Sequence, residues 1–199
     1  MIARLMPKRE AAGFTLIELL IYVSLMVVVV TLVGAILITA LTGQKDITAS
    51  SSGSTGGQLV TQNINNNVRS ATAIHVTPIS STRELLQVST PGRGATASPT
   101  CVALYFTTDD GGAVFTMSSS TTIATPTGSN PSGWTKLAEG LVKSSRPGAP
   151  STMLTANATM TTSVSYEFAI SNGSGKPQLF ASTVTSRQNI TASGSASCA

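Results

Sequence analysis

An uncharged apolar stretch near the start of the chain constrains its structure more than any other feature. It runs for 23 residues, from Leu19 to Leu41, and reads LLIYVSLMVVVVTLVGAILITAL. A helix of about 20 apolar residues spans the hydrocarbon core of a bilayer. A cleaved secretory signal would have a shorter apolar run followed by its small-residue site, whereas Ala11-Ala12-Gly13 precedes this run. We therefore expect a membrane-spanning helix.

Basic residues on one side of this stretch predict its orientation. Arg4, Lys8 and Arg9 precede the apolar run. Positively charged flanks stay in the cytoplasm, which sends the chain after Leu41 to the outer face of the membrane. We therefore expect a single-pass protein of the cytoplasmic (inner) membrane with its C-terminal part outside.

The chain contains two cysteines, Cys101 and Cys198, and both lie in the part expected outside the membrane. Cysteines in such an oxidising compartment tend to pair. A disulfide between them would close a loop of about 100 residues and contribute about 4 to 5 kcal/mol in the chain-entropy model. Two separate free thiols are the alternative.

An acid lies inside the apolar region. Glu18 is the fifth residue of the stretch that begins at Phe14. A carboxylate in hydrocarbon costs about 2.5 to 3.5 kcal/mol on translocon scales, so such a group needs a partner. A free α-amino group on a neighbouring subunit is a suitable partner, because the two charges would form one buried ion pair.

The segment KREAAGFTLIELLIYVSLMVVVV resembles the processing and methylation signature of type IV prepilins and pseudopilins. The resemblance implies that a prepilin peptidase cuts after Gly13 and methylates the new amino terminus at Phe14. Glu18 matches the acid of that signature. Many major pilins have a kinking proline about twenty residues into the mature helix, where this chain has Gly34 and Ala35. This departure favours a minor pilin or minor pseudopilin.

The resemblance also implies partners and a destination. The partners are a prepilin peptidase, other pilin or pseudopilin subunits, the inner-membrane assembly platform and membrane lipid. The subunit would end in a cell-surface pilus or a pseudopilus, and no cofactor is expected. DNA is disfavoured but left open because some pili serve DNA uptake. From Phe14 onward the net charge is only 9 − 7 = +2, and the basic residues are scattered singly.

The chain beyond the anchor predicts a polar helix followed by strands. Val60, Ile64 and Val68 in the stretch Gln58–Ala73 recur every four residues, as on one face of an amphipathic helix. The preceding Ala49–Gly57 is rich in Ser and Gly, which allows either a flexible break or a frayed continuous helix. The expected organisation is a leader at 1–13, an assembly helix at 14–41, a polar helical continuation with a Gly/Ser break at 42–73 and a β-rich head at 74–199.

Two hairpins are expected in the head. CVALYFTT and AVFTM flank the turn formed by Asp109, Asp110 and two glycines, and VSYEFAI and QLFASTV flank a second turn. The segment Ser118–Pro150 is rich in Pro and Gly and predicts a long surface loop with short strands near Trp134 and Leu141. The predicted fold class is α+β: type IV pilin-like, with a long N-terminal hydrophobic helix and a small antiparallel sheet as head.

Motifs for catalysis or metal binding are not found in the sequence. His75 is the single histidine, with no HxxH or cysteine cluster beside it, and we expect it on the surface or on an edge strand. GxSxG, SxxK and Walker-type motifs are absent, so we do not expect an enzyme. The acids Asp109 and Asp110 lack the alternating ligands of an EF-hand loop and fit a turn better than a calcium site.

The sequence therefore predicts a structural subunit that assembles through its N-terminal helix. Pilus biogenesis, DNA uptake and type II secretion all remain open as its setting. The first alternative is a membrane-anchored surface binding protein that never polymerises and uses Glu18 for another intramembrane contact. A secreted hydrolase with an uncleaved anchor is a third hypothesis, and it lacks a catalytic constellation.

Overall fold

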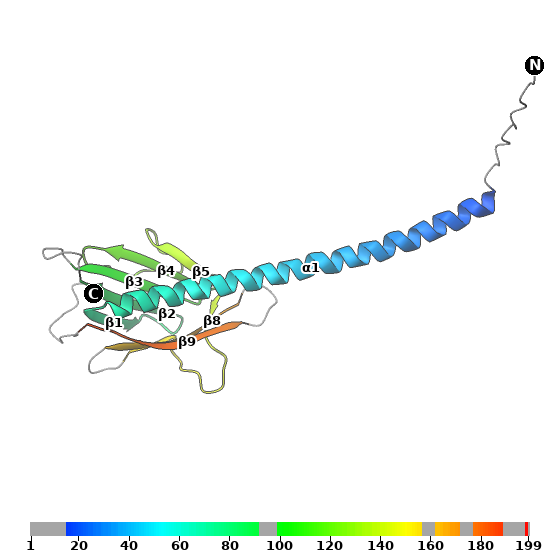
Figure 1. Ribbon diagram of the computed structural model, residues 1–199. Helices are drawn as coiled ribbons and strands as arrows, with labels where there is room; N and C mark the ends of the chain where they lie inside the picture. The colour runs from blue at the N-terminus through cyan, green and yellow to red at the C-terminus, as the bar shows by residue number, and fades with distance from the viewer. Residues whose placement is uncertain (1–14, 92–98, 157–161, 172–176, 189–197, 199) are drawn as a thin grey trace, which may run out of the picture. The chain divides into compact units, whose positions relative to one another are not determined.

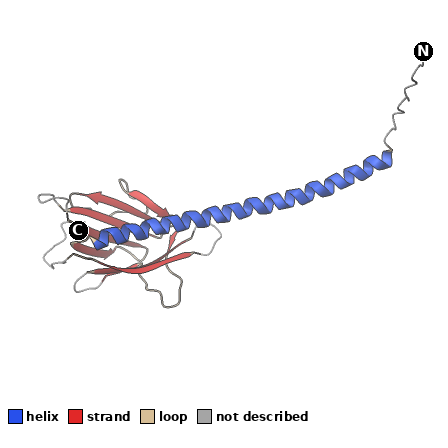
Figure 2. Ribbon diagram, in the orientation of Figure 1, coloured by secondary structure: helices blue, strands red, loops and turns tan. Residues whose placement is uncertain are grey.

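The computed structural model divides into two compact units, Met1–Lys45 and Asp46–Ala199. A long helix, α1, begins near the N-terminus, and antiparallel strands follow it, which confirms the α+β class (Figures 1 and 2). The structure describes residues 15–91, 99–156, 162–171, 177–188 and 198.

Helix α1 extends from Leu16 to Arg69. Thr15 caps its first turn, because the Thr15 hydroxyl accepts a hydrogen bond from the backbone N–H of Glu18 at 3.4 Å. The acid itself lies in this first turn, where a negative charge is favourable to the helix dipole.

The end of α1 differs from the expectation. We expected helix as far as Ala73, but α1 ends at Arg69. The backbone N–H of Thr72 instead donates to the carbonyl of Ser89 at 2.8 Å, and Ala73 begins the first strand. Sheet pairing therefore replaces the last helical turn.

The Gly/Ser-rich segment Ala49–Gly57 is helical throughout. Of the two conformations left open by the sequence, the structure has the continuous helix. Packing explains two of its glycines: a Cβ at Gly57 would overlap the ring of Phe180, and one at Gly56 would lie 3.1 Å from the Cβ of Ala138. The missing side chains let the helix lie close to the head.

Five strands form the first sheet as an antiparallel meander, in which each strand pairs with the next along the chain. β2 is buried along most of its length. The strands are β1 (Ala73–Pro78), β2 (Arg83–Thr90), β3 (Thr100–Thr107), β4 (Ala113–Ser119) and β5 (Thr135–Glu139).

A second antiparallel sheet is built around β8, which pairs with β6 and β7 on one side and with β9 along its whole length. We expected one small sheet, so the head is larger and more layered than the sequence predicted. The strands are β6 (Leu141–Val142), β7 (Leu154–Ala156), β8 (Ser163–Ile170) and β9 (Gln178–Thr185).

Both predicted hairpins are confirmed. β3 and β4 are joined through a short 3-10 turn, Asp109–Gly111. Asp110 there has a φ of 50° and Gly112 a φ of 74°, both in the left-handed region. β8 and β9 pair in register from Ser163 opposite Thr185 to Ile170 opposite Gln178.

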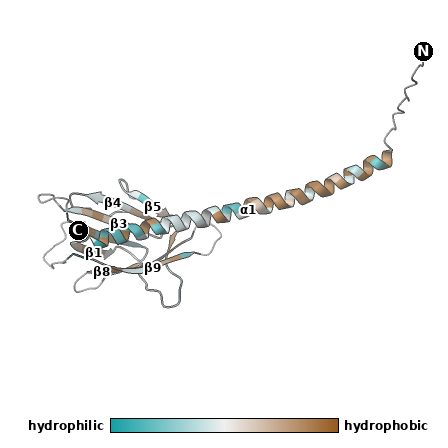
Figure 3. Ribbon diagram, viewed as in Figure 1, coloured by the Kyte–Doolittle hydropathy of each residue, from teal (hydrophilic) through white to brown (hydrophobic). Residues whose placement is uncertain are grey.

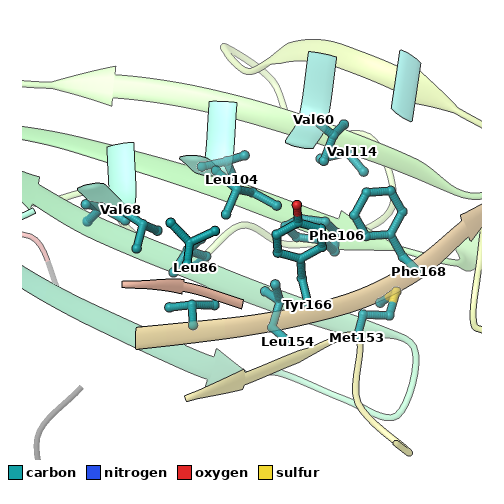
Figure 4. Packing of buried hydrophobic residues seen from close by; sticks show 14 of the residues in the cluster. Val60, Val68, Leu86, Leu104, Phe106, Val114, Met153, Leu154, Tyr166 and Phe168 are labelled. Carbon is teal, nitrogen blue, oxygen red and sulfur yellow. The ribbon is translucent and has the colours of Figure 1, made fainter. Parts of the chain in front are cut away.

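The main core lies where the second half of α1 meets the inner faces of both sheets (Figure 4). Val60, Ile64 and Val68 are fully buried, which confirms the predicted stripe. Rings from the two sheets meet there as well, with the centroids of Phe106 and Phe168 separated by 5.9 Å. The helix therefore supplies one wall of the head's hydrophobic core.

A second, smaller core covers the other face of the first sheet. The 120–134 segment crosses that face, and Tyr105 donates from its hydroxyl to the carbonyl of Gly128 at 2.6 Å. Trp134 packs edge-on against Tyr105 with the ring centroids 6.1 Å apart. Trp134 is thus a local anchor, and the short strands predicted near it and near Leu141 are confirmed as β5 and β6.

Candidate functional site

The first part of α1 presents an apolar surface. Leu16–Lys45 is 30 residues long and apolar enough to cross a membrane, and its most apolar window has no buried residue (Figure 3). Large side chains along it are exposed, from Leu16 at 83% to Leu41 at 51%. Exposed apolar surface of this extent requires lipid or protein to cover it.

Hydroxyl groups within this apolar segment form hydrogen bonds inside the helix. The hydroxyl of Ser24 donates to the carbonyl of Ile21 at 2.8 Å, and Thr31 and Thr39 donate to carbonyls in their preceding turns. A membrane-spanning segment must satisfy its polar groups internally, because hydrocarbon offers no partners. The segment is therefore suited to lipid in its side-chain chemistry as well as its length.

Glu18 is the acid of this segment. Its backbone N–H donates to both the carbonyl and the hydroxyl of Thr15, at 3.1 and 3.4 Å. The Thr15-x-x-Glu18 spacing matches a capping box, in which an acid at the third helical position supports the helix start. The predicted processing residues Gly13 and Phe14 lie outside the described residues, so the pairing of Glu18 with the Phe14 amine stays a prediction.

The predicted disulfide between Cys101 and Cys198 is present. Their Cα atoms are 5.4 Å apart, and both residues are buried in the smaller core. The side-chain amide of Gln87 donates to the carbonyl of Cys198 at 2.8 Å and to that of Ile123 at 3.0 Å. Local sequence patterns do not predict this buried amide, because its partners are 36 and 111 residues away.

A buried acid also escaped the sequence analysis. Glu84 on β2 is 2% exposed. Its two carboxylate oxygens accept hydrogen bonds from the backbone N–H groups of Met153 and Leu154, at 2.8 and 2.7 Å. These bonds tie the first sheet to the start of β7. Since the partners are backbone groups, no residue pattern predicts these hydrogen bonds.

The acidic turn between β3 and β4 borders an open cavity of about 570 Å³. Asp109 pairs with Arg83, and Asp110 accepts a hydrogen bond from the Ser129 hydroxyl. Across the cavity, the hydrogen bond from Lys136 lowers the pKa of Glu139. The described part of the chain contains no group of three or more His, Cys, Asp or Glu placed to hold a metal.

His75 lies exposed on β1, at the edge of the first sheet, as predicted. A second open groove, of about 460 Å³, lies between the polar face of α1 and β9. Gln58, Gln62 and Arg69 line its helical side, and the ring of Phe180 lines the other.

Comparisons with known proteins assign no family to the chain. No protein-family model matches it, and neither a curated protein nor a solved structure shows significant similarity.

Proposed function

We propose that this chain is a minor structural subunit of a type IV pilus or of a type II secretion pseudopilus. The observation that carries the proposal is the exposed apolar surface of Leu16–Lys45, with Glu18 in its first turn and the KREAAGF segment directly before it. The continuation of the same helix into the core of a folded head supports the proposal, because such a helix can carry the head into a filament.

Cleavage after Gly13 would create the partner that Glu18 needs. The bond that is cut frees an α-amino group on Phe14, which is then methylated. In a filament this cation of one subunit meets the Glu18 carboxylate of a neighbour, and the ion pair fixes the register of the packed helices. The exposed leucines and valines of α1 would exchange lipid for neighbouring helices.

The proposal includes the partners expected from the sequence. Prepilin peptidase processes the chain in the inner membrane, and the assembly platform moves it from lipid into contact with other pilin or pseudopilin subunits. The head remains on the outer side of the membrane. Its disulfide supports this location, because disulfides persist in oxidising compartments.

Processing can be tested by blocking the cleavage site. With prepilin peptidase present, the unaltered chain should lose its first thirteen residues, and Gly13→Val should leave the full-length precursor in the membrane, because a branched side chain obstructs the extended backbone at the cut. Intact-mass spectrometry measures both. A control, Gly43→Val, introduces the same change in the helix and should be processed normally.

An unaltered chain that keeps its first thirteen residues would contradict the proposal. That result would favour the non-polymerising, membrane-anchored surface binding protein instead.

The role of Glu18 is tested separately. Glu18→Val should leave cleavage unchanged but lower incorporation into filaments by at least about tenfold, which corresponds to loss of about 1.4 kcal/mol of pairing free energy. Immunoblotting of sheared filaments against membrane-bound subunit measures the ratio. Glu18→Asp keeps the charge and should retain more assembly than Glu18→Val, and equal incorporation of all three chains would refute the pairing role.

A further inference from the structure

Two arginines lie together at one end of the head. The backbone N–H of Arg187, just after β9, donates to the carbonyl of Arg69 at the end of α1, at 3.0 Å. Both residues are exposed. Among the described arginines of the head, Arg83 and Arg146 form ion pairs, whereas Arg69 and Arg187 have none with described residues. Counting only the part of the chain that the structure describes, this end of the head carries two positive charges without an ion-pair partner.

The groove between α1 and β9 leads to this basic end. Its helical wall carries the side chains of Gln58, Gln62 and Asn66 and ends at Arg69. Amide side chains both donate to and accept from peptide groups. Guanidinium groups bind carboxylates through paired N–H donors. The groove can therefore bind a short peptide segment that carries an acid: the amide side chains would contact its backbone, and the guanidinium groups would contact its carboxylate.

The opposite end of the head presents such a segment. The β3–β4 turn, Asp109–Gly111, follows Thr107, which pairs with Arg83 at one end of β2. The end of α1 adjoins Ser89 near the other end of β2. Eight strand residues separate these ends by about 24 Å. Asp110 in the turn is exposed and forms no ion pair with a described residue; its hydrogen bond comes from Ser129.

Polarity in the membrane limits how two copies can meet. If the proposed function holds, all copies are anchored with the same polarity, and copies that follow one another in a filament meet through a heterologous contact, which joins one surface of a copy to a different surface of the next. The basic groove end and the acidic turn are two different surfaces, at opposite ends of β2.

We propose that the α1–β9 groove of one copy receives the β3–β4 turn of a second copy, with Asp110 bound by Arg69 and Arg187. The occupant is inferred from charge complementarity between the two ends. Complementary charges of this kind determine register and partner choice more than affinity. The contact would therefore set the register between two adjacent copies whose main attraction comes from the apolar helices.

Charge reversal tests the contact in the processed full-length chain, in cells that contain the peptidase and the assembly machinery. Three variants are compared: Arg69→Glu with Arg187→Glu, Asp110→Arg, and all three changes together. Multimers are trapped with an amine-reactive cross-linker and quantified by immunoblot. We expect the first two variants to lose multimers at least about fivefold, because attraction becomes repulsion, and the triple variant to recover to within about twofold.

A control introduces two glutamates elsewhere on the head. Ser145→Glu with Thr155→Glu adds two negative charges at exposed positions in and before β7, and should leave multimers unchanged. Resistance of every variant to protease verifies that the head is folded. Co-expression of the two reversed variants should also restore multimers, because each then carries the complement of the other.

Multimers that are insensitive to both reversals, or that the triple variant fails to recover, would overturn the docking while leaving the proposed function intact. Cross-links found by mass spectrometry only to a different pilin-like subunit would overturn the second copy as occupant. If the unaltered chain is neither processed nor cross-linked, the proposed function and the docking fail together.

Discussion

At the scale of single residues, Gly112 lies in a turn that the sequence predicts, but it also makes a tertiary contact that the sequence does not predict. The Asp-Asp-Gly-Gly sequence indicates a tight turn, and Gly112 indeed has a φ of 74°. The structure adds a contact between the sheets: the carbonyl of Gly112 accepts from the N–H of Gly140 at 2.8 Å, and a Cβ at Gly112 would overlap the backbone of Leu141. Leu141 is 29 residues away, beyond the reach of local patterns.

Gly112→Ala should lower the free energy of unfolding by about 3 kcal/mol, since left-handed strain of about 1 to 2 kcal/mol adds to overpacking against Leu141. Chemical denaturation of the purified chain in detergent, followed by tryptophan fluorescence, measures the change. Gly128→Ala is the control: Gly128 has a φ of 78° but open space around it, so only the strain applies. Equal losses in the two variants would rule out the contact with Leu141.

At the scale of elements, local sequence patterns predicted the hairpins and the buried face of α1, which depend mainly on neighbouring residues. The β3–β4 and β8–β9 hairpins follow from alternating apolar residues around turn formers, and the buried stripe of α1 follows from its four-residue spacing. The 120–134 segment was expected as a surface loop from its prolines and glycines. Its attachments to the sheet, such as Tyr105 to Gly128, could not be predicted because they join distant parts of the chain. For the same reason the β8–β9 hairpin was predicted, but not its place in a second sheet with β6 and β7.

The glycines of α1 gave an ambiguous signal because propensity and packing act in opposite directions. Isolated helices lose about 1 kcal/mol per glycine relative to alanine, which favours a break at Gly56 and Gly57. Close packing requires the same residues, since Phe180 occupies the space of a Cβ at Gly57. Only the position of Phe180, more than 100 residues later, decides between these effects.

Gly57→Ala should therefore lack the usual helix stabilisation and instead lower the free energy of unfolding by about 1 to 3 kcal/mol through overpacking. Combining it with Phe180→Ala, which empties the space, should recover part of the loss. A double-mutant cycle from denaturation midpoints gives the coupling, expected at about 0.5 to 3 kcal/mol. Strictly additive effects would show that the ring and the helix do not compete for the same volume.

At the scale of the whole molecule, one covalent link joins remote parts of the head. The disulfide connects Cys101 on β3 with Cys198, 97 residues later, and Gln87 adds hydrogen bonds to the Cys198 and Ile123 carbonyls. The disulfide was expected from the sequence, because both cysteines follow the apolar segment. The amide beneath the disulfide was not, because it belongs to a different strand.

Removing the disulfide should have a large effect. Cys101→Ala with Cys198→Ala should lower the free energy of unfolding by about 4 to 5 kcal/mol in the chain-entropy model. The disulfide closes a loop of about 100 residues, and without it the unfolded chain regains the conformational entropy that this loop closure removes. Thermal unfolding with and without reductant measures it. Reductant should destabilise the unaltered chain and leave the double variant unchanged; a reductant effect on the double variant would place the sensitivity elsewhere.

The helix that carries the exposed apolar surface also supplies Val60, Ile64 and Val68 to the main core. All three side chains are fully buried, so drawing this helix out of the head would expose them to water. Exposing one such side chain costs about 1.5 to 3 kcal/mol. A force that extracts the helix therefore has to unfold the core of the head.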